Sequence, residues 1–376
     1  MKTPICAKLG CEVPIFAFSH CRDVVVEVTR AGGFGVLGAA TFSPAQLETE
    51  LAWIDRHTAG RPYGVDVIIP SSYDPEAERS AGDLEKLIPA AHRKFMDELL
   101  TREGVPDLPD GERERIVGEI VAGRGSMTPD GARRLVEVAL RHPQVRMVVS
   151  ALGAPPPDVI AQLRAAGVVI GSMCGKVEHA KRQMAAGVEL IVAQGTEAGG
   201  HTGDIATMVL VPQVVEACGA DVAVLAAGGI TRGSQIAASL ALGAQGVWCG
   251  TIWLGTRESE LDEFEKAAVF AARAEDAVRR RARTGKTVRM IKSKLSEAWE
   301  APDAPPYLPT PLQGVLYNQA HARVVRARRA DLYSFPVGQS VGDVNAETSV
   351  REVMLRLQTE YLDAASRFAA LNPEAQ

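Results

Sequence analysis

Eight short apolar runs rich in valine and isoleucine recur through the first two-thirds of the 376-residue sequence, and most are separated by stretches with helical periodicity. Such alternation is typical of a parallel sheet whose strands are connected by helices. The expected strands are residues 13–18, 35–38, 64–69, 145–150, 168–173, 189–194, 222–227 and 246–250. Because a closed (β/α)8 barrel requires eight such units, the sequence predicts an α/β fold of the TIM-barrel class.

The expected helices carry recognisable boundary residues. They include residues 23–31, 44–57, 130–142, 157–166, 177–186 and 234–242. Asp23 is predicted to cap the first of these, because its side chain can accept a hydrogen bond from a free N–H group at a helix start. Gly167, Gly187 and Gly243 follow three helix ends, where glycine readily adopts the left-handed conformation.

An insertion at residues 71–129 follows the third expected strand and interrupts the repeat. It contains helix-like pieces at 83–100 and 112–122 around a joint rich in proline and glycine at 104–111. Because it replaces a βα loop, it should emerge on the C-terminal face of the barrel, where active sites lie. It could be a lid that selects substrate, or equally a peripheral decoration or subunit contact.

The tail, residues 258–376, is expected to be predominantly helical, with a proline-rich crossing at 301–311 and a closing helix at 348–371. We expect it to pack on a barrel formed by residues 1–257, insertion included, rather than to form an independent domain. A basic run at 279–294 is expected to be a solvated helical surface, which is favoured over a site for a polyanion.

Composition and charge narrow the class of function. With 46% hydrophobic residues the chain can bury a large core, and its formal net charge of −5 gives no reason to expect nucleic acid or an anionic membrane as a partner. The apolar segment 205–227 is interrupted by Pro212, Gln213, Glu216 and Asp221, so no membrane span is expected. The N-terminal residues MKTPICAKLG lack the apolar core of a signal peptide.

The cysteines point to an intracellular compartment. They form no C-x-x-C pair and no metal-ligand spacing, so we expect free thiols, no metal site and a cytoplasmic protein. The six residues are Cys6, Cys11, Cys21, Cys174, Cys218 and Cys249. The oligomeric state stays open, with a homodimer as one possibility.

The loop after the sixth strand, residues 193–203, has the sequence AQGTEAGGHTG. Its four glycines allow sharp turns and close approach of the backbone to a ligand, and His201 can move protons near neutral pH. Glu197 lies nearby in the sequence but could equally be a solvated carboxylate. Asp204 is predicted to cap a helix that begins near Ile205.

Two glycine motifs end the seventh and eighth strands. Gly228 and Gly229 directly precede a helix, and Gly250 and Thr251 close the eighth strand. Loops after these strands form the usual phosphate site of this barrel, where backbone N–H groups and a helix N-terminus meet the anion. The pair of motifs therefore predicts a ligand with a phosphate group, and His201 lies one strand earlier on the same rim.

These residues resemble the flavin-dependent nitronate monooxygenases, formerly called 2-nitropropane dioxygenases. The likeness is strongest over residues 168–260, where VEHAK, AQGTEAGGHTG, LAAGGI and GVWCGT occur in the order and spacing of the family. It is weaker over AGGFGVL (31–37), GVD (64–66) and PVGQSVG (336–342). Residues 71–129 have no counterpart in it.

The resemblance implies a TIM barrel that binds FMN non-covalently and passes electrons from an alkyl nitronate to O2, giving a carbonyl compound and nitrite. His201 would be the catalytic base, needed only when a neutral nitroalkane must lose its α-proton. The implied cofactor-binding residues are Phe18, Asp66, Gln194, Gly199 and Gly200 near the ring system, and Gly228, Gly229, Trp248, Cys249, Gly250 and Thr251 near the phosphate.

Two positions depart from the family pattern. The usual Ala-Pro-Met at the end of the first strand is Phe16-Ala17-Phe18, and the usual asparagine of Gly-Val-Asn is Asp66. Asparagine can donate a hydrogen bond to a flavin carbonyl, whereas an ionised aspartate can only accept one. Asp66 must therefore accept from a flavin N–H group, be protonated, or point elsewhere.

Two other functions fit parts of the pattern. Enoyl-thioester reductases that transfer hydride from NAD(P)H through FMN are similar in the same Gly-Gly-His loop, although no G-x-G-x-x-G nicotinamide motif is visible. A non-enzymatic module that binds flavin or a phosphometabolite is the least favoured, because His201 would then have no role.

Overall fold

The computed structural model describes residues 1–69 and 81–371, so the first ten residues of the insertion, 71–80, and the final five lie outside the description. Eight parallel strands close into a barrel in sequence order, with β1 paired to both β2 and β8. Their bounds are β1 Ile15–Ser19, β2 Phe34–Gly38, β3 Tyr63–Val67, β4 Val145–Ser150, β5 Val169–Cys174, β6 Leu190–Gln194, β7 Ala223–Ala227 and β8 Gly246–Cys249. The predicted TIM-barrel fold is confirmed.

The alternation of side chains along each strand divides the core into two layers. One cluster fills the barrel interior, with Phe16, Phe34, Met147 and Leu225 among its members. The other lies between the strands and the surrounding helices and takes the intervening residues, such as Val65. The helix α1 (Pro4–Leu9) packs into the interior cluster, and Thr3 beside it donates a hydrogen bond to the Gln245 carbonyl just before β8 (2.6 Å).

The ring of helices follows the predicted order closely. Its members are α2 Arg22–Arg30, α3 Pro44–His57, α7 Pro129–Leu140, α8 Pro157–Ala165, α9 Val177–Ala186, α10 Thr207–Cys218 and α11 Gly233–Ala241. Gly167, Gly187 and Gly243 all have positive φ just past helix ends, as expected. The cap at Asp23 was wrong: α2 begins one residue earlier, its N-cap is Cys21, and Asp23 lies in the first turn, where its charge still favours the helix dipole.

The described part of the insertion forms three helices, α4 (Ala81–Leu87), α5 (Ala90–Arg102) and α6 (Glu112–Gly125). Pro89 separates α4 from α5, which the sequence pattern had joined as one helical piece. The end of α6 also contacts the loop after β2, because the Ser126 hydroxyl donates to the Phe42 carbonyl (2.6 Å). The insertion is thus attached to the rim of the barrel at this end.

The tail contains strands as well as helices. Its elements are η2 Thr251–Gly255, α12 Glu263–Ala271, η3 Ala274–Asp276, β9 Ala277–Arg280, β10 Val288–Ile291, α13 Lys294–Ala298, α14 Leu312–Arg326, η4 Gln339–Asp343 and α15 Val350–Leu371. β9 and β10 pair antiparallel, so the basic run is a β-hairpin and the expected helical surface was wrong. The reason is visible in β10, where Val288, Met290 and Ile291 are buried together with Arg289, and in the turn at Gly285, which has φ +79°.

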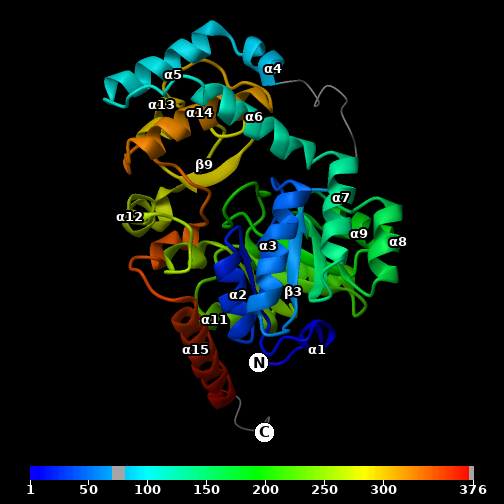
Figure 1. Cartoon of the computed structure of the whole chain (residues 1–376). Coiled ribbons are helices and arrows are strands. Elements are labelled where there is room, and N and C mark those ends of the chain that lie inside the picture. The colour runs from blue at the N-terminus through cyan, green and yellow to red at the C-terminus, as the bar shows by residue number, and fades with distance from the viewer. Residues whose placement is uncertain (70–80, 372–376) are drawn as a thin grey trace.

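The insertion and the tail share a second hydrophobic core. In Figure 1 the cyan helices α4–α6 lie beside the orange helices α13 and α14, and β9 lies between them and the barrel. This core contains Met96, Leu99, Leu100 and Val117 from the insertion, and Phe264, Leu295, Trp299, Val315, Leu316 and Tyr333 from the tail. The last helix, α15, packs instead on α11 and α2 at the outside of the barrel.

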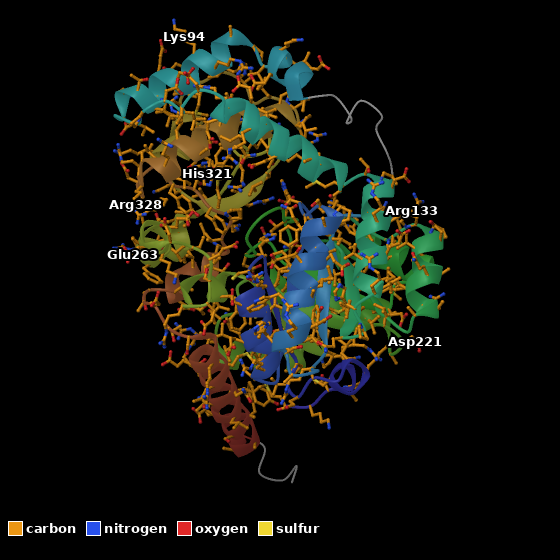
Figure 2. The ribbon with its side chains drawn as sticks, in the orientation of Figure 1. Lys94, Arg133, Asp221, Glu263, His321 and Arg328 are labelled. Atoms are coloured by element: carbon orange, nitrogen blue, oxygen red, sulfur yellow. The ribbon has the colours of Figure 1, made fainter. Side chains whose placement is uncertain are left out.

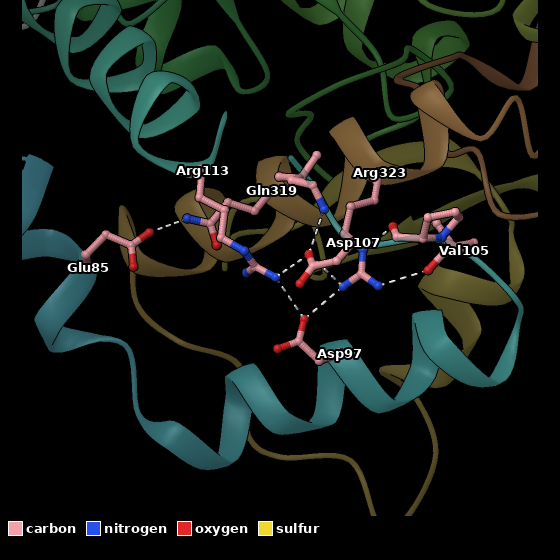
Figure 3. Close-up of polar contacts among 9 residues, drawn as sticks. Glu85, Asp97, Val105, Asp107, Arg113, Gln319 and Arg323 are labelled. Carbon is pink, nitrogen blue, oxygen red and sulfur yellow. Dashed lines mark hydrogen bonds and ion pairs between the residues drawn. The ribbon is translucent and has the colours of Figure 1, made fainter. Parts of the chain in front are cut away.

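A buried arginine reinforces the joint between insertion and tail (Figure 3). The Arg323 guanidinium, 4% exposed, donates to the carbonyls of Val105 and Pro106 (3.0 Å each) and to Asp97 (2.8 Å). Arg113 binds Asp97 (3.3 Å) and Asp107 (2.6 Å) in the same network. An open cavity of about 400 Å³ beside Arg323 is lined by this network and not by residues of the barrel rim.

Among the described helices, none is long and apolar enough to cross a membrane. The same part of the chain contains no group of three or more histidine, cysteine, aspartate or glutamate residues that could hold a metal ion.

Candidate active site

Several predicted site residues face the barrel interior at the C-terminal ends of their strands. Trp248 of β8 belongs to the interior cluster, and Phe18 of β1 packs against it. Their rings stack with centroids 5.9 Å apart and an interplanar angle of 25°. By the same alternation Asp66 and Gln194 face inward, because their neighbours Val65, Val67 and Ala193 lie in the outer layer. Strand register therefore brings these side chains to one end of the barrel.

Asp66 is the most unusual polar group of this wall. The residue is 3% exposed, and its Oδ2 atom has no hydrogen-bond partner in the described chain. Burial alone, with no neighbouring charge to offset it, raises the pKa of the Asp66 carboxyl to about 8. The group is therefore mostly protonated at neutral pH and can donate a hydrogen bond, as an asparagine side chain can.

The loop after β6 is held by Glu197. Its carboxylate accepts hydrogen bonds from the Thr207 N–H group (3.0 and 3.1 Å) and the Thr207 hydroxyl (2.8 Å) at the start of α10. Glu197 thus performs the capping role predicted for Asp204, and that prediction was wrong: the N-cap residue is Ala206, and Asp204 pairs with Arg279 of β9. The Glu197 carboxylate is bound to protein, not free in solvent.

His201 contacts the hairpin of the tail. Its Nδ1 atom lies 3.0 Å from the Thr287 carbonyl oxygen, which can only accept, so Nδ1 carries the hydrogen and the neutral ring has its lone pair on Nε2. Although the residue is exposed, desolvation of its ring lowers the His201 pKa, and the charges of Lys286 and Arg283 lower it further against the opposing effect of the Thr287 bond. A neutral imidazole with a free Nε2 is the form that a general base requires.

The hairpin extends across the loop as a neighbouring strand. Gly200 and Arg289 exchange both backbone hydrogen bonds, of 3.0 and 2.8 Å. The side chain of Arg289, 7% exposed, also donates to the carbonyls of Thr196 (2.8 Å) and Ala277. Sequence reasoning missed this contact, because charge dominates the segment. The alternation of Val288 and Met290 beyond a Thr-Gly turn was the signal that could have revealed it.

The PVGQSVG segment (336–342) closes the other side of the loop. The Gly338 N–H group donates to the Thr251 hydroxyl oxygen (2.8 Å), and the Gln339 N–H group donates to the Glu197 carbonyl (2.9 Å). A Cβ atom on Gly199 would lie 2.7 Å from the Val337 backbone, so only glycine fits there. The loop after β6, the segment after β8 and residues 336–342 thus meet around Gly199 and Thr251.

The loops after β7 and β8 have the predicted glycine geometry. Gly228 and Gly229 adopt φ of +107° and +72°, which turns the backbone sharply after β7. The N-terminus of α11, however, is already bound, because the Gly233 N–H group donates to Glu360 of α15 (2.7 Å). The Cys249 side chain faces the outer layer, and its carbonyl accepts from the Trp253 indole (2.8 Å).

Comparison with known proteins agrees with this geometry. The family model described as nitronate monooxygenase matches residues 19–360. A provisionally named monooxygenase of Mycobacterium tuberculosis (strain H37Rv) is 46% identical over 380 residues, which are 99% of each chain. The solved nitroalkane oxidase of Streptomyces ansochromogenes is 28% identical, with a TM-score of 0.76 over 95% of this chain and 98% of that one.

A more distant structure shares the fold alone. FabK of Thermotoga maritima is 22% identical, with a TM-score of 0.70 over 99% of each chain. The match to the family model covers the glycine motifs after β7 and β8 and the loop that carries His201. It also covers the hairpin β9–β10, which contacts this loop. The chain therefore belongs to the nitronate monooxygenase family and is a flavin-dependent oxidoreductase that acts on nitro compounds.

Proposed function

We propose that the protein uses FMN to oxidise alkyl nitronates with O2, giving a carbonyl compound and nitrite. The observation that carries the proposal is the state of His201, a neutral base whose Nδ1–H group is fixed on Thr287 and whose Nε2 has no partner among the described residues. It stands on the loop after β6, beside the rim that the carboxyl ends of β7, β8 and β1 form.

The rim suits a flavin in three respects. Asp66 has a buried polar atom without a partner, which a ligand could satisfy. Phe18 and Trp248 give a flat apolar wall. The backbone turn at Gly228 and Gly229 can direct N–H groups to a phosphate.

The proposed cofactor contacts keep the grouping that the family resemblance implies. The residues near the isoalloxazine would be Phe18, Asp66, Gln194, Gly199 and Gly200, and those near the phosphate Gly228, Gly229, Trp248, Cys249, Gly250 and Thr251. Cys249 could act only through its backbone, because its side chain points into the outer layer. Since Glu360 already binds the start of α11, the phosphate would be held by loop N–H groups and the start of η2.

Bound FMN would supply the two-electron chemistry that transfers electrons from the nitronate to O2. The residues of the chain would position the substrate and remove one proton from it. For a neutral nitroalkane, His201 Nε2 would take the α-proton, while Thr287 holds the ring through Nδ1. A preformed nitronate has already lost this proton, so it needs His201 less.

Side-by-side anaerobic titrations test this function. We expect yellow protein whose flavin absorbance is bleached by propionate 3-nitronate and changes slowly or not at all with NADH or NADPH. Rapid reduction by NAD(P)H with no response to nitronates would instead indicate a reductase of the enoyl-thioester type. A colourless protein that takes up no FMN on reconstitution would contradict the cofactor assignment.

A further inference from the structure

The hairpin holds His201 through the Thr287 carbonyl, but the proposed chemistry does not explain its many positive charges. β9, β10 and their turn carry Arg279, Arg280, Arg281, Arg283, Lys286 and Arg289 within eleven residues. Arg279 is paired with Asp204, Arg280 with Glu300, and Arg289 is buried on backbone carbonyls. Arg281 donates to the Gly285 carbonyl (2.8 Å) within the turn and lies over the Tyr307 ring (5.2 Å). Of the three cations without an ion pair or full burial, Arg283 and Lys286 are the two whose charges act on His201.

No carboxylate in the described chain forms an ion pair with either of these two cations. Lys286 is exposed and immediately precedes Thr287, whose carbonyl binds His201. Arg283 lies over the Tyr317 ring (5.3 Å) and reaches the Ser334 carbonyl at 3.5 Å, so its charge is not neutralised. The charges of both residues are close enough to lower the His201 pKa.

The two carboxylates near His201 in the sequence, Glu197 and Asp204, already have partners. Glu197 is bound to Thr207 on the loop side, and Asp204 is bound to Arg279 on the hairpin side. Arg289, which pairs with Gly200 next to His201, is also positive. The surroundings of His201 therefore carry an excess of positive charge, which favours the approach of anions.

We propose that Lys286 and Arg283 form an electropositive entrance to the His201 site that selects the anionic nitronate over the neutral nitroalkane. This inference rests on the proposed function for the identity of the substrate. The charges would act at two stages: they attract the anion as it approaches, and they disfavour the imidazolium form of His201, which keeps Nε2 available as a base.

Reversal of one charge tests the proposal. Lys286→Glu should raise the His201 pKa by several tenths of a pH unit, measured by imidazole NMR titration with His201→Gln for assignment. Lys94→Glu is the matched control, because Lys94 is highly exposed on α5 at the far tip of the insertion (Figure 2) and has the same charge change. It should leave the His201 pKa unchanged.

Turnover gives a second readout. At low salt, kcat/KM for propane 2-nitronate should fall about 3- to 10-fold in Lys286→Glu, and the difference from wild type should shrink at high salt, because ions screen exposed charges. The KM for neutral 2-nitropropane should not change. If Lys286→Glu behaves like Lys94→Glu in both the pKa and the salt dependence, the proposal is wrong.

A non-reacting pair of probes separates this proposal from the oxidation itself. Propionate and its neutral isostere propionamide can be compared through the shift of the His201 NMR signal. Wild type and Lys94→Glu should prefer propionate, and Lys286→Glu should lose that preference. Loss of preference without any nitronate oxidation would overturn the proposed function but uphold the electropositive entrance, whereas equal affinities in wild type would overturn the entrance.

Discussion

Two titratable groups at the same end of the barrel are kept neutral in opposite ways. Asp66 lies in the dry interior wall, where burial without any charge partner raises its pKa to about 8. His201 lies at the entrance, where desolvation is assisted by two cations and a backbone carbonyl fixes the tautomer. The state of Asp66 depends on depth alone, while that of His201 depends on a segment 86 residues later in the chain.

Because the causes differ, the protonation states of Asp66 in the wall and of His201 at the entrance should respond to different perturbations. Salt or a distant charge should alter His201 and leave Asp66 unaffected, because only the exposed charges are screened. Substitutions that open the wall should do the reverse.

The largest expected effect follows from removal of the base. His201→Ala should lower kcat/KM for a neutral nitroalkane on the order of 10²- to 10⁴-fold, the usual contribution of a positioned general base. The loss with a preformed nitronate should be much smaller. Steady-state kinetics with both substrate forms check this, and equal losses for the two would show that His201 does not act on the proton.

Asp66 should make the protein less stable as pH rises. The folded-state pKa is raised above the unfolded value near 3.8, so the folded state holds an extra proton between pH 4 and 8 and loses stability across that window. The full cost above pH 8 is on the order of 5 kcal/mol. Denaturant unfolding at pH 5 and pH 9 measures it, with FMN absent.

Asp66→Asn should remove this pH dependence and be the more stable protein at pH 9. The exposed Asp221→Asn is its matched control (Figure 2) and should behave like wild type at both pH values. A wild-type protein whose stability is the same at pH 5 and pH 9 would show that Asp66 is ionised throughout.

Arg289 holds the hairpin against the loop that carries His201. Arg289→Gln should reduce the free energy of unfolding by about 1–3 kcal/mol, because the carbonyls of Thr196 and Ala277 lose a buried donor. It should also lower kcat with neutral nitroalkanes, since the hairpin that carries Thr287 is loosened. Arg281→Gln, at an exposed position of the same hairpin, should cost little in either assay.

The smallest effect concerns the cap of α10. Glu197→Ala should destabilise the protein by about 0.5–2 kcal/mol, the usual cost of losing an N-terminal cap. Asp204→Ala should destabilise the protein less than Glu197→Ala, because its ion pair with Arg279 is exposed on the aspartate side. Thermal or denaturant unfolding of the two variants measures these losses of stability. A larger loss in Asp204→Ala than in Glu197→Ala would show that Asp204 is the cap of α10.

The wall of the site could be predicted from sequence, whereas the entrance could not. Strand alternation is local, so the inward position of Asp66 and the glycine turn after β7 follow from neighbouring residues. The partner of His201 is distant in the sequence. Asp204 is the better cap for α10 by residue type and by its position in the sequence, and only the path of the loop brings Glu197 to Thr207 instead. Likewise, nothing near Arg289 in the sequence indicates that it pairs with Gly200.

The pairing of Gly200 with Arg289 also bears on the order in which the protein is made. A ribosome completes the eighth strand, at Cys249, before it makes either strand of the hairpin. The barrel can therefore close around its interior first, while the loop that carries His201 still lacks its neighbouring strand. Competence for proton transfer is then among the last properties that the nascent chain acquires.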